Sequence, residues 1–241
     1  AALRKLSCFV MVLSYSRMIY LEFTLSQSLE DFLACHVHAF NFFGGIPKKI
    51  LYDNLKTVFL SRVGRDIRFH PRFMDFAGAY LFEPVPCNVR AGWEKGKVES
   101  GIRYIRISFL AGRPITSWPR LARDADHWRD NVANVRTHGT TAEKPIDRFP
   151  ADKAALRPLP PRDYDTSIVR PVKATRQAFI LFDVNAYSVP AALTGKALIL
   201  KADPHHVRVF NGQDQVAEHP RSYEKNLAIE RPEHRQDILA I

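Results

Sequence analysis

The sequence changes character at a proline-rich stretch, and this change constrains the fold more than any other feature. Up to about residue 149, short β-branched and aromatic runs alternate with longer segments of helical periodicity. The stretch RPLPPRD, residues 157–163, then holds three prolines in seven residues, which is typical of a semi-rigid linker. Every later apolar run has the pattern of a strand. We therefore predict an α/β domain over residues 1–149, a linker over 150–162 and a small β-barrel over 163–241.

The α/β part is expected to begin with two strands and to alternate afterwards. Apolar spacing of three and four residues predicts helices, and short β-branched or aromatic runs predict strands. The predicted strands cover residues 6–16, 17–25, 48–53 and 83–87, and the predicted helices cover 28–45, 70–82, 95–110 and 121–138. Residues 61–69 are interpreted as a basic loop or an irregular strand. In the second part, Asn211-Gly212 predicts a tight hairpin.

The charge balance favours a polyanionic partner. The chain has 35 Lys and Arg against 25 Asp and Glu, a net charge of +10, and such an excess is typical of nucleic-acid binding, although ordinary surface charge is the alternative. The three cysteines show neither a disulfide framework nor metal-ligand spacing. No apolar run approaches the ~20 residues of a membrane span. A cytoplasmic protein fits these features.

Two carboxylates are candidates for metal-dependent chemistry on DNA. Asp53 ends the apolar run of residues 50–52 and is followed by Asn54, so it is either a turn residue or a ligand. Glu99 lies on the helix predicted over 95–110, so it is either a surface residue or a second ligand. Two divalent ions held by carboxylates from different elements assist in-line phosphodiester chemistry. The order of strands and helices around these residues suggests a ribonuclease H-like fold.

Cations surround Glu99 along the same predicted helix. Those nearest to it are Lys95, Lys97, Arg103 and Arg106. Arg103 and Arg106 follow Glu99 by four and seven residues, which places all three on one face of an α-helix. A carboxylate among cations is interpreted as a metal ligand beside a phosphate track. In contrast, His36 and His38 fall on different helix faces and are not expected to share a metal.

Three segments carry a family resemblance. ILYDNLK, FHPRFMDFAGAYLFEPVPCNVRAGWEKGKVES and ANVRTHGTTAEKPIDRF are similar to IstA-like transposases of two-gene bacterial insertion sequences, within the DDE transposase and retroviral integrase group. NAYSVPAALTGKALIL resembles the β-barrel that follows their catalytic core. The resemblance implies that Asp53 and Glu99 are catalytic ligands of two Mg²⁺ or Mn²⁺ ions. It also implies that Arg106 contacts DNA, and that Asn54 and Lys56 orient Asp53 or meet a phosphate.

One expected feature of this family is missing from the chain. The family's first catalytic aspartate lies on a strand that precedes residue 9, and no acidic residue here replaces it. We therefore expect an N-terminally truncated ribonuclease H-like core. The implied function is metal-dependent 3′-end cleavage and strand transfer by a DNA transposase. The alternative is an inactive remnant that only binds DNA. The implied partners are element-end and target DNA, further copies of the chain and an ATPase helper protein.

Overall fold

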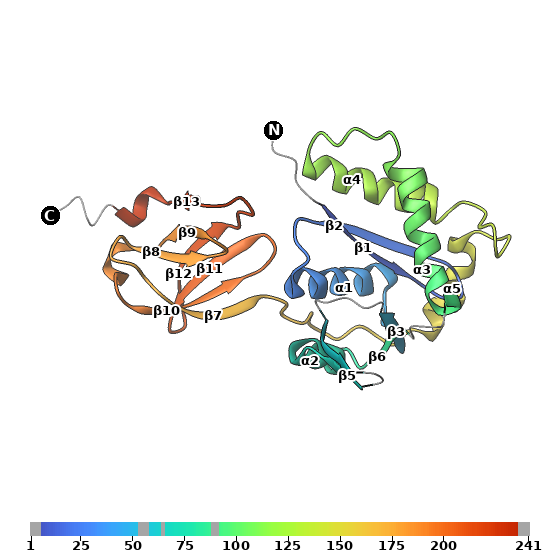
Figure 1. Ribbon diagram of the computed structural model, residues 1–241, viewed down its shortest axis with the longest axis horizontal. Coiled ribbons are helices and arrows are strands. Elements are labelled where there is room, and N and C mark those ends of the chain that lie inside the picture. Colours follow the sequence, from blue (N-terminus) through green and yellow to red (C-terminus); the bar gives the residue numbers. More distant parts are fainter. Residues whose placement is uncertain (1–5, 53–57, 64–65, 88–91, 236–241) are drawn as a thin grey trace. The chain divides into compact units, whose positions relative to one another are not determined.

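The computed structural model describes residues 6–52, 58–63, 66–87 and 92–235. The chain divides into two compact units, Ala1–Tyr164 (unit 1) and Asp165–Ile241 (unit 2), which are described separately below. Unit 1 is a mixed α/β structure, and unit 2 consists mainly of strands (Figure 1). No helix within the described ranges is long and apolar enough to cross a membrane.

Unit 1 begins with an antiparallel hairpin followed by a helix. Strands β1 (Ser7–Val12) and β2 (Ile19–Thr24) pair so that Val12 lies opposite Ile19. Helix α1 (Leu29–Phe43) begins where the Ser28 side chain accepts a hydrogen bond from the Asp31 amide, and it ends at Gly44 in a left-handed conformation, φ 67°. The strands and the helix predicted for this region are confirmed.

The next strands form two further small pairs. Strand β3 (Lys49–Tyr52) pairs in parallel with β6 (Glu83–Pro86). Between them lie the antiparallel pair β4 (Phe59–Val63) and β5 (Asp66–Phe69), followed by helix α2 (Pro71–Ala79). Residues 61–63 and 66–69 therefore belong to strands, which favours the irregular strand over the loop. Pro71 occupies the first turn of α2, where its missing amide hydrogen costs nothing.

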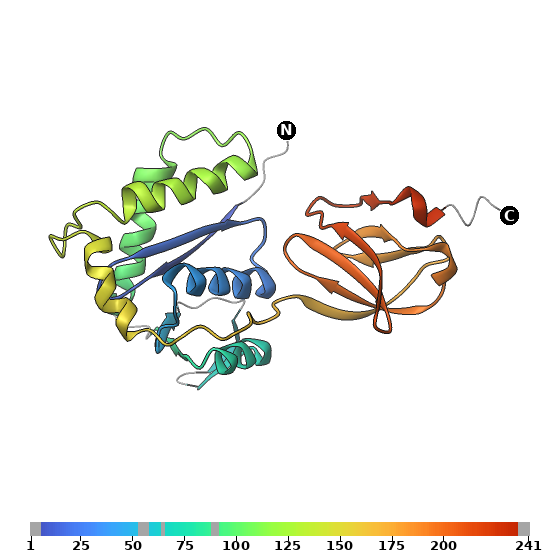
Figure 2. The same cartoon turned by 180° about the vertical axis from the view of Figure 1, so that it is seen from behind.

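Three further helices follow in unit 1, and the first two cover the other face of the β1–β2 hairpin. They are α3 (Gly92–Tyr104), α4 (Trp118–Trp128) and α5 (Pro145–Ala155). Two of them continue into π-helical segments: α3 into Ile105–Leu110 and α4 into Arg129–Ala133. Side chains of β2 alternate between two cores: Tyr20 packs with α1, whereas Leu21 and Phe23 pack with α4. The hairpin is thus the middle layer between α1 and the pair α3 and α4 (Figure 2).

The structure differs from the predicted linker over residues 150–162. Helix α5 continues through residue 155. The following extended segment packs against the core of unit 1 through Leu156, Leu159 and Tyr164, and Arg157 forms a β-bridge with Ile46. Prolines favour an extended backbone, but here the apolar residues between them give that backbone a face to bury.

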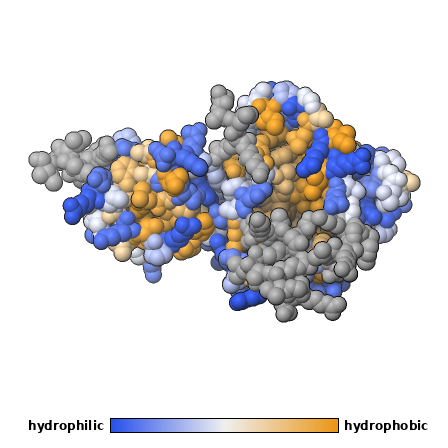
Figure 3. Space-filling model, viewed as in Figure 1, coloured by the Kyte–Doolittle hydropathy of each residue, from blue (hydrophilic) through white to orange (hydrophobic). Residues whose placement is uncertain are grey.

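Unit 2 contains two open sheets around its own core. One has the order β12-β11-β10-β7 and the other β13-β9-β8. The strands are β7 (Ile168–Lys173), β8 (Phe179–Phe182), β9 (Asn185–Ser188), β10 (Ala197–Ala202), β11 (His206–Asn211), β12 (Asp214–Pro220) and β13 (Ala228–Ile229). The predicted hairpin is confirmed, because Asn211 pairs with Asp214 around Gly212. Among residues 165–235 the sheets do not close, so the predicted barrel is not found. Hydrophobic patches lie among hydrophilic residues on the visible face of unit 2 (Figure 3).

Candidate functional site

A cavity of about 820 Å³ lies within unit 1 between strands β1 and β3. Residues 7–14 line one side of it without interruption, and residues 47–52 line the other. Alternate residues of a strand point to opposite faces of a sheet, so an unbroken run of lining residues means that the cavity is bordered by strand edges. Within the described ranges, β1 pairs only with β2, and β3 pairs only with β6. We call this cavity the groove.

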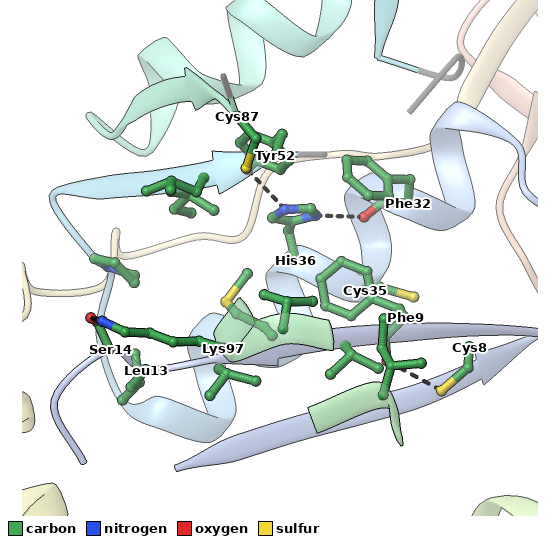
Figure 4. Close-up of a pocket in the computed structure, with 18 of the residues that line it drawn as sticks. Cys8, Phe9, Leu13, Ser14, Phe32, Cys35, His36, Tyr52, Cys87 and Lys97 are labelled. Atoms are coloured by element: carbon green, nitrogen blue, oxygen red, sulfur yellow. Dashed lines mark hydrogen bonds between the residues drawn. The ribbon is translucent and has the colours of Figure 1, made fainter. Parts of the chain in front are cut away.

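Helices close the groove from two directions. Phe32, Cys35 and His36 of α1 line it (Figure 4). Residues of α3 also line it, and they include Lys97 and Glu99. The groove is therefore a slot with two strand edges as its sides and helices above and below.

Glu99 is the predicted catalytic residue that the structure places at the groove. It is exposed on α3 and is one of the lining residues. Asp53, Asn54 and Lys56 lie outside the described residues. Tyr52, which directly precedes Asp53 in the sequence, lines the same groove as Glu99.

The predicted basic residues fall into two groups. Lys97 lines the groove, and its Nζ donates a hydrogen bond to Ser14 Oγ. Arg103 lies on α3 and Arg106 on the π-helical segment that follows; both are exposed, and neither lines the groove. The side chain of Lys95 lies outside the described part of the chain.

A hydrogen-bonded chain of neutral groups lies at the wall of the groove. His36 Nδ1 is 2.8 Å from the Phe32 carbonyl oxygen and must donate to it, so Nε2 accepts from the Tyr52 hydroxyl at 2.9 Å (Figure 4). Burial lowers the pKa of His36 to about 4 and raises the pKa of Tyr52 well above its usual value. His38 instead faces Glu22, at 2.9 Å. These two histidines thus serve separate structural contacts.

The donor set at the groove fits a hard divalent cation only in part. Carboxylate oxygens such as those of Glu99 are the ligands that Mg²⁺ and Mn²⁺ prefer. Among the residues that the structure describes, however, no three His, Cys, Asp or Glu side chains are grouped as metal ligands. A complete site would need carboxylates beyond Glu99.

Known proteins similar to this chain are insertion-sequence transposases. The family described as Mu transposase, C-terminal domain, matches residues 159–231. The protein named as transposase of insertion sequence element IS5376 in Geobacillus stearothermophilus is 38% identical over 197 residues, which are 82% of this chain and 49% of that protein. The transposase of insertion sequence element IS21 from Pseudomonas aeruginosa is 30% identical, over 89% of this chain and 56% of its own length. The chain therefore belongs to the IS21-family transposases. This confirms the predicted resemblance.

The chain spans about half the length of these IS21-family relatives. A transposase from Aminobacter aminovorans is 33% identical over 89% of this chain and 42% of that protein. Among solved structures, the HTLV-2 integrase catalytic core domain in complex with magnesium is similar at a TM-score of 0.41 and 13% identity, covering 61% of this chain and 86% of that one. A simian T-cell lymphotropic virus intasome is similar at a TM-score of 0.45 and 14% identity, covering 88% and 69%.

Proposed function

We propose that this chain is the catalytic part of a DNA transposase that cleaves 3′ ends of an insertion sequence and joins them to target DNA. Sequence identity of 30 to 38% to several transposases, over more than four fifths of the chain, carries this proposal. The groove supports it, because Glu99 and the residue before Asp53 line one cavity.

The groove accepts a further β-strand, which completes a ribonuclease H-like sheet. Two strand edges that have no partner strand among the described residues face it from opposite sides, and each unpaired backbone group that is buried costs roughly 1–3 kcal/mol. A strand between β1 and β3 would satisfy both edges at once. The same strand would carry the third carboxylate that the ligand set lacks.

Glu99 and Asp53 hold Mg²⁺ or Mn²⁺ together with that carboxylate. A pair of such ions would stabilise the attacking and leaving oxygens of an in-line displacement. The basic side chains that stand near Asp53 and Glu99 in the sequence position the DNA backbone. They are Lys56, Lys95, Lys97, Arg103 and Arg106. Asn54 supports Asp53.

The partners follow from the same proposal. Unit 1 binds element-end and target DNA, and unit 2 serves as a small barrel-like module for DNA or for a second copy. The intact transposase also works with an ATPase helper protein.

Strand transfer is the decisive assay. This chain, and a version joined to the remaining part of the Pseudomonas aeruginosa relative, are incubated with labelled IS21-type ends and Mg²⁺ or Mn²⁺. The extended protein should join the ends, and Asp53→Asn or Glu99→Gln should abolish joining. Asp75→Asn, an exposed acidic residue of α2 that does not line the groove, is the matched control. Full activity of Asp53→Asn or of Glu99→Gln contradicts the assignment. DNA binding without activity in the extended protein favours the inactive remnant.

A further inference from the structure

A second cavity of unit 1 is lined by several cationic side chains. It has a volume of about 440 Å³ and lies beside α3 and the turn that joins β1 to β2. Its polar side chains come from segments far apart in the sequence: Arg17, Lys97, Ser100, Arg136, His138 and Thr140. None of the nine described residues that line it is Asp or Glu. We call it the cationic pocket.

Two nitrogens of the Arg17 side chain lack a hydrogen-bond partner among the described residues. Its Nε and Nη1 atoms are buried, and neither makes a hydrogen bond within the described part of the chain. Buried polar atoms nearly always have a partner, and leaving a charged one unsatisfied costs more than leaving a neutral one. Its backbone also adopts φ 64° in the β1–β2 turn, a left-handed conformation that is uncommon outside glycine. Strained backbone conformations cluster at functional sites.

Arg136 is fixed across the pocket by its neighbours. Its guanidinium carbon lies 3.7 Å from the centre of the Tyr104 ring, and its Nη1 donates to the Ala133 carbonyl oxygen. These contacts orient the guanidinium group and leave its charge without a carboxylate partner among the lining residues.

His138 presents a donor to the same space. Its Nδ1 lies 3.2 Å from the backbone nitrogen of Thr140 and accepts a hydrogen bond from it, so the neutral ring carries its proton on Nε2. Burial, and then the charges of Arg136 and Arg17, lower the pKa of His138. The lining cations therefore repel one another, and an anion would relieve that repulsion.

We propose that the cationic pocket binds a phosphate of the DNA backbone. Guanidinium forks match the geometry of phosphate oxygens, and the Ser100 and Thr140 hydroxyls supply further donors. Lys97 lines both this pocket and the groove, so a phosphate held here lies on DNA that passes the same helix as Glu99. The choice of DNA as the source rests on the proposed function, whereas the pocket's affinity for phosphate does not.

The test compares DNA and free phosphate as ligands. Binding of a labelled random-sequence duplex is measured at several salt concentrations for the wild type, Arg17→Gln, Arg136→Gln and Arg17→Lys. Arg123→Gln, an exposed arginine of α4 outside the pocket, is the matched control. Loss of one phosphate contact should weaken binding roughly tenfold and reduce the slope of log Kd against log salt by about 1. Arg17→Lys should retain most of the slope, because it keeps the charge.

Inorganic phosphate is tested in parallel through the melting temperature and the NMR titration of His138. Phosphate should raise the melting temperature and the pKa of His138 in the wild type and the control, and do neither in Arg17→Gln. Equal DNA affinity and salt slope in all variants would overturn the proposal. A phosphate response that depends on Arg17, with unchanged DNA binding, would assign the pocket to free phosphate and overturn the DNA source. If the wild type binds no DNA, the proposed function fails. The phosphate response alone then decides whether the cationic pocket binds phosphate.

Discussion

Burial keeps the imidazole of His36 neutral and thereby links the stability of unit 1 to pH. The pKa of His36 falls from 6.5 to about 4 in the folded chain. The unfolded chain therefore binds a proton more readily than the folded one between these values. The stabilising contribution is complete above pH 6.5 and is lost as pH falls toward 4.

We predict that the free energy of unfolding falls by about 3 kcal/mol more in the wild type than in His36→Gln between pH 7 and pH 4. Urea unfolding at a series of pH values measures this difference. His127→Gln, at an exposed histidine of α4, should follow the wild type. The same pH slope in the wild type and in His36→Gln would show that His36 is not held neutral.

Single residues were predictable only where a local motif marked them. Glu99 and Lys97 stand in a recognisable segment, and the structure brings both to the groove. Arg17, Arg136 and His138 were not predicted. Arg17 is more than a hundred residues from the other two in the sequence, and what distinguishes all three is that they line one pocket, which no local pattern records.

Elements were predictable where capping and periodicity agreed. Helix α1 has its cap at Ser28 and its stop at Gly44, and both were visible in the sequence. The π-helical segments after α3 and α4 were not predicted. Apolar spacing of three and four residues does not distinguish the wider π-helical turn from an α-helical turn. The segment after α5 was predicted as a semi-rigid linker from its prolines. Its apolar residues pack against a core that is distant in the sequence, and the local pattern does not show this contact.

Gly45 tests whether the segment after α5 belongs to unit 1. A Cβ atom at this position would lie 2.7 Å from Leu156 Cβ and 2.8 Å from the Arg157 carbonyl oxygen. Gly45→Ala should therefore destabilise unit 1 by about 1–3 kcal/mol, the usual cost of overpacking. Chemical denaturation followed by tryptophan fluorescence measures it. Gly78→Ala, where a Cβ would meet nothing within 4 Å, is the control, and equal stability of the two variants would contradict this packing.

At the scale of the whole molecule, the sequence indicated two units, but it did not indicate that the described strands of the second unit form two open sheets. Turn residues and alternation predict strands one at a time, whereas barrel closure depends on which distant edges pair. The core of unit 2 is nonetheless its own, with Ile180, Leu200 and Val209 fully buried within it.

We predict that residues 165–241 fold without unit 1. The separate fragment should give dispersed amide signals by NMR and a cooperative thermal transition, because its strands bury their apolar faces against one another. The fragment of residues 1–164 is the companion measurement. A fragment 165–241 without a cooperative transition would show that the second unit depends on the first.

We expect the two groove edges that lack a partner strand in the described part of the chain to make the purified chain prone to aggregation. Unpaired backbone donors and acceptors in a row are a template for any extended peptide, including a strand of another copy. An edge buried between helices is shielded only while α1 and α3 stay in place. Concentration and heating should therefore drive purified chains into intermolecular β-sheets, and a soluble peptide that occupies the groove should act as a folding aid.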